Sequence, residues 1–225
     1  MNDKLAILKI VFYSDFWSGA LFINEYPVLM ILWNIFLLII PFFLCLFLIK
    51  YYRRTKFKKN RQKFFAIIIW FFWFLFIPNT AYVITDVRHL ANACFSNSFY
   101  HICSKNAWIV MFFFVYACVG WVSFVFLLNQ MRKFINKILG GKIEFFYIWS
   151  IIPLISIGVL LGLIDRWNSW EIFLFPLEIF KSMLKYITDI AYFTNWVIFT
   201  VGLYVLYFGG NFILNVNKKN ITKKR

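Results

Sequence analysis

Four polar side chains recur at helical spacing just after a proline. They are separated by three, four and three residues, which places them on one face of a helix: Asn79, Tyr82, Asp86 and His89. A histidine beside a carboxylate can act as a general base, because the carboxylate orients the imidazole. Pro78 bends the helix and frees carbonyls that Asn79 or Thr80 can bond. A proline kink with an interfacial cap, in which Tyr82 belongs to an aromatic belt, explains the same residues without chemistry.

A second polar stretch follows a pair of glycines that are four residues apart. Its charged and hydrogen-bonding side chains are Asp165, Arg166, Asn168, Ser169 and Glu171. Gly158 and Gly162 allow close helix packing, and Asp165 continues nearly the same face. In an enzyme, Arg166 would hold an anionic oxygen. In the alternative interpretation, Trp167 and Trp170 are belt residues, and Asp165 and Arg166 form a surface ion pair.

The composition decides what kind of protein must position these residues. Of the 225 residues, 63% are hydrophobic, 24% are aromatic and 15% are charged. Soluble domains are about 45–50% apolar and about 25% charged. A soluble domain of this length buries too little surface to hide so much apolar material from water. The composition therefore excludes a soluble enzyme, a disordered chain and a disulfide scaffold, and it indicates an integral membrane protein.

Apolar runs of about 20 residues cross the hydrocarbon core of a bilayer. The sequence predicts an all-α helical bundle, one membrane domain over residues 1–225, with spans at 26–49, 64–84, 107–128, 145–164 and 190–208. Residues 5–24 are less apolar, and they are either a weak sixth span or a helix in the interface; we favour the span. Residues 176–187 are amphipathic and begin at a proline, which predicts a short interfacial helix.

The basic residues show how the spans are oriented. Of the 24 Lys and Arg residues, eight lie in residues 50–63, four in 130–144 and five in 218–225, and only Glu144 opposes them. The loops at 85–106 and 165–189 together carry five basic and five acidic residues, so their combined charge is zero. The positive-inside rule then places the three basic segments in the cytoplasm, together with the C-terminus and, if residues 5–24 span, the N-terminus. No basic stripe with interleaved aromatics remains, so we expect no nucleic-acid partner.

This topology brings the two polar stretches to one depth. Each follows the outer end of a span, so all the candidate acid–base groups meet at the outer face of the membrane. Polar groups at this depth face the bundle or a wet cavity rather than lipid. Cys94 and Cys103 share the same outer loop, and from the residues alone a disulfide and two free thiols remain equally open.

Three motifs make the sequence resemble the bacterial membrane-protein family called domain of unknown function 1361. They are Trp33-Asn34-Ile35-Phe36-Leu37, the run Pro78-Asn79-x-x-Tyr82-x-x-Thr85-Asp86-x-x-His89-Leu90, and Arg166-Trp167-Asn168-Ser169-Trp170-Glu171. The resemblance covers nearly the whole chain. It implies a multi-spanning bacterial membrane protein without an assigned molecular function, and a hydrophobic segment before the first motif, in keeping with a sixth helix.

The chain departs from that family at three positions. Ala81 stands where a second proline is common, Leu163 where an arginine often follows the glycine, and Val110 where an acidic residue often follows Trp108. If the missing charges belong to an active site, the resemblance implies that this member is altered there.

Three classes of function are compatible with the outer polar site. The first is a non-catalytic component of the cell membrane that binds a lipid headgroup or a partner protein. The second is an enzyme for a lipid-linked substrate, with His89 as base and Asp86 orienting it. A small-solute transporter ranks third, because the charges lie at one edge of the spans. Asp86, His89 and Glu171 lack the spacing of typical metal ligands, so we expect no metal and no cofactor.

Overall fold

The computed structural model describes residues 22–23, 26–89 and 107–222. Most of residues 5–24, the stretch predicted as a weak sixth span, lies outside the described residues, and so do Cys94 and Cys103. The last part of that stretch is not helical. Phe22–Ile23 (β1) pairs antiparallel with Tyr26–Pro27 (β2), with Ile23 opposite Tyr26. Pro27 biases Tyr26 toward extended backbone, which explains why the first long helix begins two residues later than predicted.

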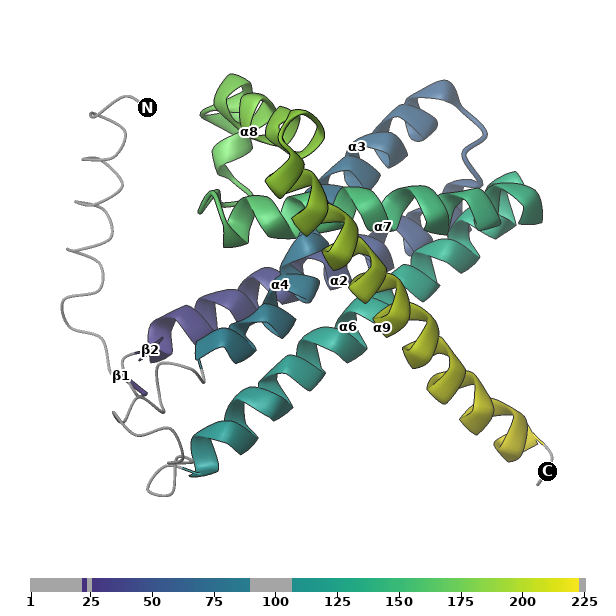
Figure 1. Cartoon of the computed structure of the whole chain (residues 1–225). Coiled ribbons are helices and arrows are strands. Elements are labelled where there is room, and N and C mark those ends of the chain that lie inside the picture. Colours follow the sequence, from purple (N-terminus) through teal and green to yellow (C-terminus); the bar gives the residue numbers. More distant parts are fainter. Residues whose placement is uncertain (1–21, 24–25, 90–106, 223–225) are drawn as a thin grey trace, which may run out of the picture.

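The long helices confirm the predicted membrane bundle (Figure 1). They are α2 (Val28–Thr55), α3 (Asn60–Phe76) with α4 (Pro78–Thr85), α6 (Ala107–Leu139), α7 (Gly141–Leu163) and α9 (Ile190–Thr222). Five helices in the described part of the chain are long and apolar enough to cross a membrane, with α3 and α4 counted together. Short 3₁₀ turns follow α4 (η1, Asp86–Arg88) and precede α8 (η2, Glu171–Phe173).

The basic segments 50–63 and 130–144, which separate predicted spans, are largely helical. Only residues 56–59 separate α2 from α3, and Gly140 alone separates α6 from α7 with a φ of 91°. Lys and Arg are good helix formers, and their long side chains reach water while their stems stay apolar, so nothing stops the helices at the membrane surface. We call the end of the bundle that holds residues 56–59 and Gly140 the basic end. The end that holds Asp86 and Asp165 is the polar end.

The short helix α8 (Pro176–Thr188) lies at the polar end (Figure 1). Its predicted apolar stripe faces away from the bundle, since Leu177, Phe180, Leu184 and Ile187 are all exposed. Ile179, Ser182 and Tyr186 are buried against the rest of the protein instead. An exposed apolar stripe on a helix too short to span is typical of a helix lying in the membrane interface.

Candidate polar site

The break between α3 and α4 positions the first polar stretch. Pro78 has no N–H, so it interrupts the helix and starts a new one after Ile77. The amide of Asn79 donates to the Phe76 carbonyl at 3.0 Å, and the Thr80 hydroxyl donates to the Ile77 carbonyl at 2.7 Å. The two side chains thus bond carbonyls beside the break, as the sequence predicted.

Glycines on two neighbouring helices hold α4 in place. A Cβ on Gly158 of α7 would lie 2.7 Å from Cγ of Pro78, and one on Gly162 would lie 3.4 Å from the Tyr82 ring. On the other side, a Cβ on Gly120 of α6 would lie 2.8 Å from the Thr80 carbonyl oxygen. The pair of glycines in α7 is therefore a packing surface for α4, and this contact brings the two polar stretches together.

A hydrogen bond joins the two stretches directly. Nδ2 of Asn79, which bonds the Phe76 carbonyl, also donates to Oγ of Ser169 at 3.1 Å. Nearby, the rings of Trp33 and Trp170 meet edge to face with their centroids 5.6 Å apart. These contacts link α2, α4 and the turn after α7 at the polar end.

Asp86 is fully buried in the turn η1 that follows α4. Its Oδ2 accepts a hydrogen bond from Nδ2 of Asn34 in α2 at 3.0 Å. Its Oδ1 lies 3.9 Å from Nε2 of His89. Tyr116 of α6 interacts electrostatically with both Asp86 and Asn34. The sequence pattern did not identify Asn34 or Tyr116 as site residues, although an asparagine inside an apolar span was a signal for the first.

His89 is held neutral by its surroundings. Burial, followed by the positive charges of Arg88 and Arg166, lowers the pKa of His89 to about 4. Nε of Arg88 donates to Nε2 of His89 at 3.4 Å, and Nη2 of Arg88 donates to the Tyr82 hydroxyl at 3.1 Å. The effect of Arg166 on the pKa of His89 also indicates that the two stretches lie within electrostatic range of one another.

In the second stretch, the carboxylate of Glu171 accepts hydrogen bonds from a residue of the same turn. Oε2 of Glu171 accepts hydrogen bonds from the backbone N–H of Asn168 at 2.6 Å and from its side chain at 3.1 Å. Glu171 is buried. Arg166 is exposed and has a φ of 61°, a left-handed conformation that costs about 1 kcal/mol for a residue with a side chain. This turn ends α7 and reverses the chain.

Asp165 is directed to α8 rather than to the first stretch. Its Oδ2 accepts a hydrogen bond from the Tyr186 hydroxyl at 3.1 Å, and Nζ of Lys185 lies 3.9 Å from its Oδ1. Burial and the charge of Asp165 raise the pKa of Tyr186, so this phenol stays a donor. Asp165 thus pairs with Lys185 and not with Arg166, contrary to the surface pair considered above.

In the part of the chain that the structure describes, no three His, Cys, Asp or Glu side chains come together as a metal ion would require.

A second polar network, at the basic end, was missed. Nε of Arg132 lies 2.5 Å from Oε1 of Glu144. Nη1 of Arg132 donates to the Tyr207 hydroxyl at 3.4 Å. The Tyr207 hydroxyl donates to Asn129 at 3.1 Å, and Asn129 bonds Asn211. Glu144 was the available signal, since it is the only acidic residue among the basic segments.

Comparison with known proteins places the chain in a family. The model of the family described as "Protein of unknown function (DUF1361)" matches residues 33–207, and so includes all three motifs noted in the sequence. Neither a curated protein nor a solved structure matches the chain.

Proposed function

The chain belongs to the family of unknown function DUF1361, and from its polar end we propose a non-catalytic membrane component that binds an anionic lipid headgroup. The site lies at the outer face of the cell membrane if the basic end is cytoplasmic, as the positive-inside rule requires. Its parts are Arg88 and Arg166, with Asp86 and His89 beneath them.

The state of His89 carries this proposal. Two guanidinium groups and burial lower the pKa of this imidazole to about 4. A general base works best with a pKa near the operating pH, so a histidine this weakly basic is poorly suited to remove a proton at pH 7. The same electropositive surroundings favour an anion such as a headgroup phosphate, which accepts charge-assisted hydrogen bonds from arginine.

The carboxylates support a structural role for the acidic residues. Asp86 accepts from Asn34, Glu171 from Asn168, and Asp165 from Tyr186. Each of these bonds fixes a turn or a helix end. Arg166 is exposed at the turn that ends α7, where its guanidinium group can reach an anion in the headgroup layer.

A thermal-shift experiment tests the proposal. The purified protein in detergent is heated with added phosphatidylglycerol or with phosphatidylcholine of the same chains. We expect the anionic lipid to raise Tm further, by about 2–4 °C for each kcal/mol of binding. Arg88→Gln and Arg166→Gln should remove the difference between the two lipids.

Lys181→Gln is the matched control for the loss of one charge at the polar end. Lys181 is exposed on α8, where it forms a surface ion pair with Glu178 at 3.2 Å, so this variant should keep the full preference for phosphatidylglycerol. Equal shifts with both lipids in the unaltered protein would rule out an anionic headgroup. A soluble or membrane protein that co-purifies with the unaltered chain and is lost from both arginine variants would favour a partner protein instead.

A further inference from the structure

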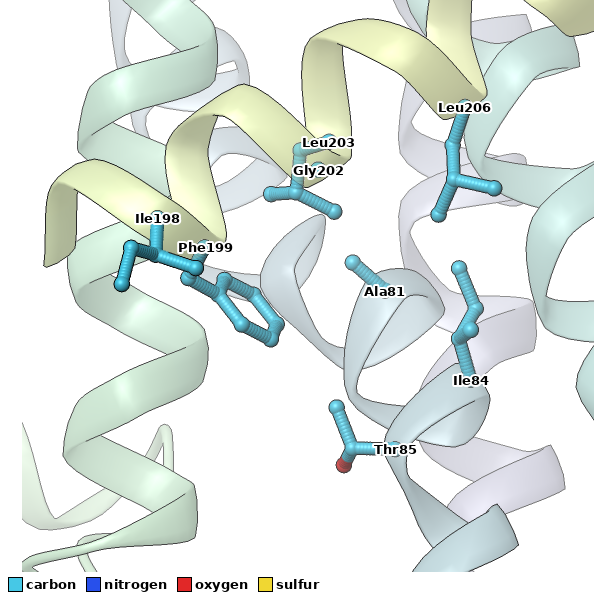
Figure 2. A pocket seen from close by; sticks show the side chains of 8 residues that line it. All are labelled: Ala81, Ile84, Thr85, Ile198, Phe199, Gly202, Leu203 and Leu206. Carbon is cyan, nitrogen blue, oxygen red and sulfur yellow. The ribbon is translucent and has the colours of Figure 1, made fainter. Parts of the chain in front are cut away.

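An apolar groove runs between α4 and α9 (Figure 2). Its volume is about 220 Å³. It is lined from one side by α4 and from the other by α9, with Ala81, Ile84 and Thr85 facing Ile198, Phe199, Gly202, Leu203 and Leu206. Gly202 leaves space in the wall, since nothing lies within 4 Å of a Cβ built on it.

The chemistry of the groove suits hydrocarbon. Both walls belong to helices that are long and apolar enough to cross a membrane. The one side-chain oxygen in the lining is the hydroxyl of Thr85, and it already donates to the Tyr82 carbonyl at 2.7 Å. The lining therefore offers an occupant mainly dispersion contacts.

Hydrogen bonds to the other helices keep α9 at its distance from α4. Nε1 of Trp196 donates to the Pro153 carbonyl at 3.0 Å, and the Tyr204 hydroxyl donates to the Trp149 carbonyl at 2.7 Å. Pro153 lacks the N–H that would have bonded the Trp149 carbonyl within α7, which explains why Tyr204 does so. On the α6 side, Nε1 of Trp121 donates to the Leu206 carbonyl at 2.9 Å.

The groove leads to the proposed headgroup site. Thr85 is the last residue of α4, and Arg88 is the last residue of the turn η1 that follows it. Arg88 follows Thr85 by three residues, and its Nη2 donates back to the Tyr82 hydroxyl at 3.1 Å, so its guanidinium group lies near the end of α4 that lines the groove. The cation thus stands at the end of the apolar groove, which is the arrangement of charge and hydrocarbon in an anionic lipid.

We propose that the groove between α4 and α9 holds one acyl chain of a lipid whose anionic headgroup is bound at Arg88. This inference rests on the proposed function and narrows its ligand to a membrane lipid rather than a free anion. A helix from another protein is about 10–12 Å across with its side chains, which is large for a groove of about 220 Å³. A single hydrocarbon chain is the thinner occupant and matches the apolar lining. Since lipid surrounds the whole bundle, the preference for the groove comes from closer packing and from the headgroup contact.

Photo-cross-linking in nanodiscs tests this. The full-length protein is reconstituted in phosphatidylcholine with a small fraction of phosphatidylglycerol that carries a diazirine in its acyl chain. Cross-links are mapped by mass spectrometry. We expect them to concentrate on residues 81–85 and 198–206, and to fall about tenfold in Gly202→Leu, the equivalent of about 1.4 kcal/mol of lost binding.

Gly209→Leu is the matched control. Gly209 lies on the same helix, and a Cβ there also has nothing within 4 Å, but Gly209 does not line the groove. This variant should cross-link like the unaltered protein. Cross-links spread evenly over the lipid-facing surface, or unchanged in Gly202→Leu, would overturn the groove. A dimer that Gly202→Leu dissociates, with no lipid cross-links in the groove, would overturn it too.

The same variants separate this inference from the proposed function. If Gly202→Leu changes nothing while Arg88→Gln removes the preferential stabilisation by phosphatidylglycerol, the groove is wrong and the headgroup site stands. If Gly202→Leu removes the cross-links while phosphatidylcholine carrying the same diazirine labels the groove equally, the groove binds chains without a headgroup preference. That second result would overturn the link between the groove and Arg88, while the proposed function would still be decided by the thermal shift with phosphatidylglycerol.

Discussion

The hydrogen bond between Asn34 and Asp86 joins the beginning of α2 to the end of α4. Asp86 is fully buried, and a buried carboxylate that loses a donor pays for its desolvation. We expect Asn34→Leu to lower the free energy of unfolding by about 1.5–3 kcal/mol, the range for hydrogen bonds to charged groups. Thermal unfolding in detergent measures this.

Asn136→Leu is the control for the same substitution at an exposed position of α6. It should change stability by less than about 0.5 kcal/mol. Equal losses in the two variants would mean that the Asn34 bond adds nothing to the stability of the fold.

His89 makes stability depend on pH with a definite sign. The pKa of His89 is about 4 in the folded protein and 6.5 for a histidine in water, as in the unfolded chain. Between pH 4 and pH 6.5 the unfolded state therefore binds more protons. Stability should therefore fall as the pH drops from 6.5 toward 4. Allowing for the partial exposure of His89, we expect a loss of about 1–2 kcal/mol. Unfolding curves at pH 7 and pH 4.5 measure it.

His89→Gln removes the titrating group and should flatten that part of the pH profile. Glu178→Gln, on the exposed side of α8, should leave the profile as it is. A pH dependence that is identical in all three proteins would show that His89 is not the group responsible.

At the scale of elements, α4 fits between α6 and α7 because both present glycine to it. The Cβ of an alanine at Gly158 would lie 2.7 Å from the rigid Pro78 ring, so one of the two helices must move. We expect Gly158→Ala to cost about 1–3 kcal/mol, as overpacking does. Gly209→Ala meets nothing within 4 Å and should be neutral or slightly stabilising. The melting temperatures of the two variants test this prediction, and equal values would contradict close packing at Gly158.

Much of the bundle could be predicted because run length and hydropathy determine where helices cross a membrane. The five spans, the amphipathic α8 and the break at Pro78 were all predicted. The helix ends were not, because nothing in Lys- and Arg-rich segments stops a helix. The outward direction of the apolar stripe of α8 agrees with the predicted interfacial helix.

The site was only partly predictable for a geometric reason. Residues 79, 82, 86 and 89 have a helical spacing, but the helix tightens to a 3₁₀ turn at Asp86, which changes the direction of the last two. Asp165 and Arg166 are adjacent in sequence, yet the backbone is left-handed at Arg166 and Asp165 bonds Tyr186 of α8. Neither change of direction has a glycine to mark it.

At the scale of the whole molecule, the charge asymmetry predicts the orientation. Reporter fusions at residues 60 and 225 should both score cytoplasmic, and a fusion at residue 98 should score external. The basic end carries nearly all of the excess positive charge, so neutralising residues 50–63 alone should weaken this orientation without reversing it. An external signal at residue 60 would mean that the orientation is reversed and that the polar site lies at the cytoplasmic face. Placing the N-terminus inside is a separate prediction, tested by tagging Met1.

The outward stripe of α8 also bears on how the protein meets bilayers of different thickness. A helix lying in the interface with Leu177, Phe180, Leu184 and Ile187 in contact with lipid resists movement along the membrane normal. Asp165 and Tyr186 tie that helix to the end of α7, so the polar end keeps a fixed depth. Hydrophobic mismatch must then be absorbed at the opposite end, where long basic helices can tilt and their lysines extend toward water. A thinner membrane would reshape the basic end and leave the polar end undisturbed.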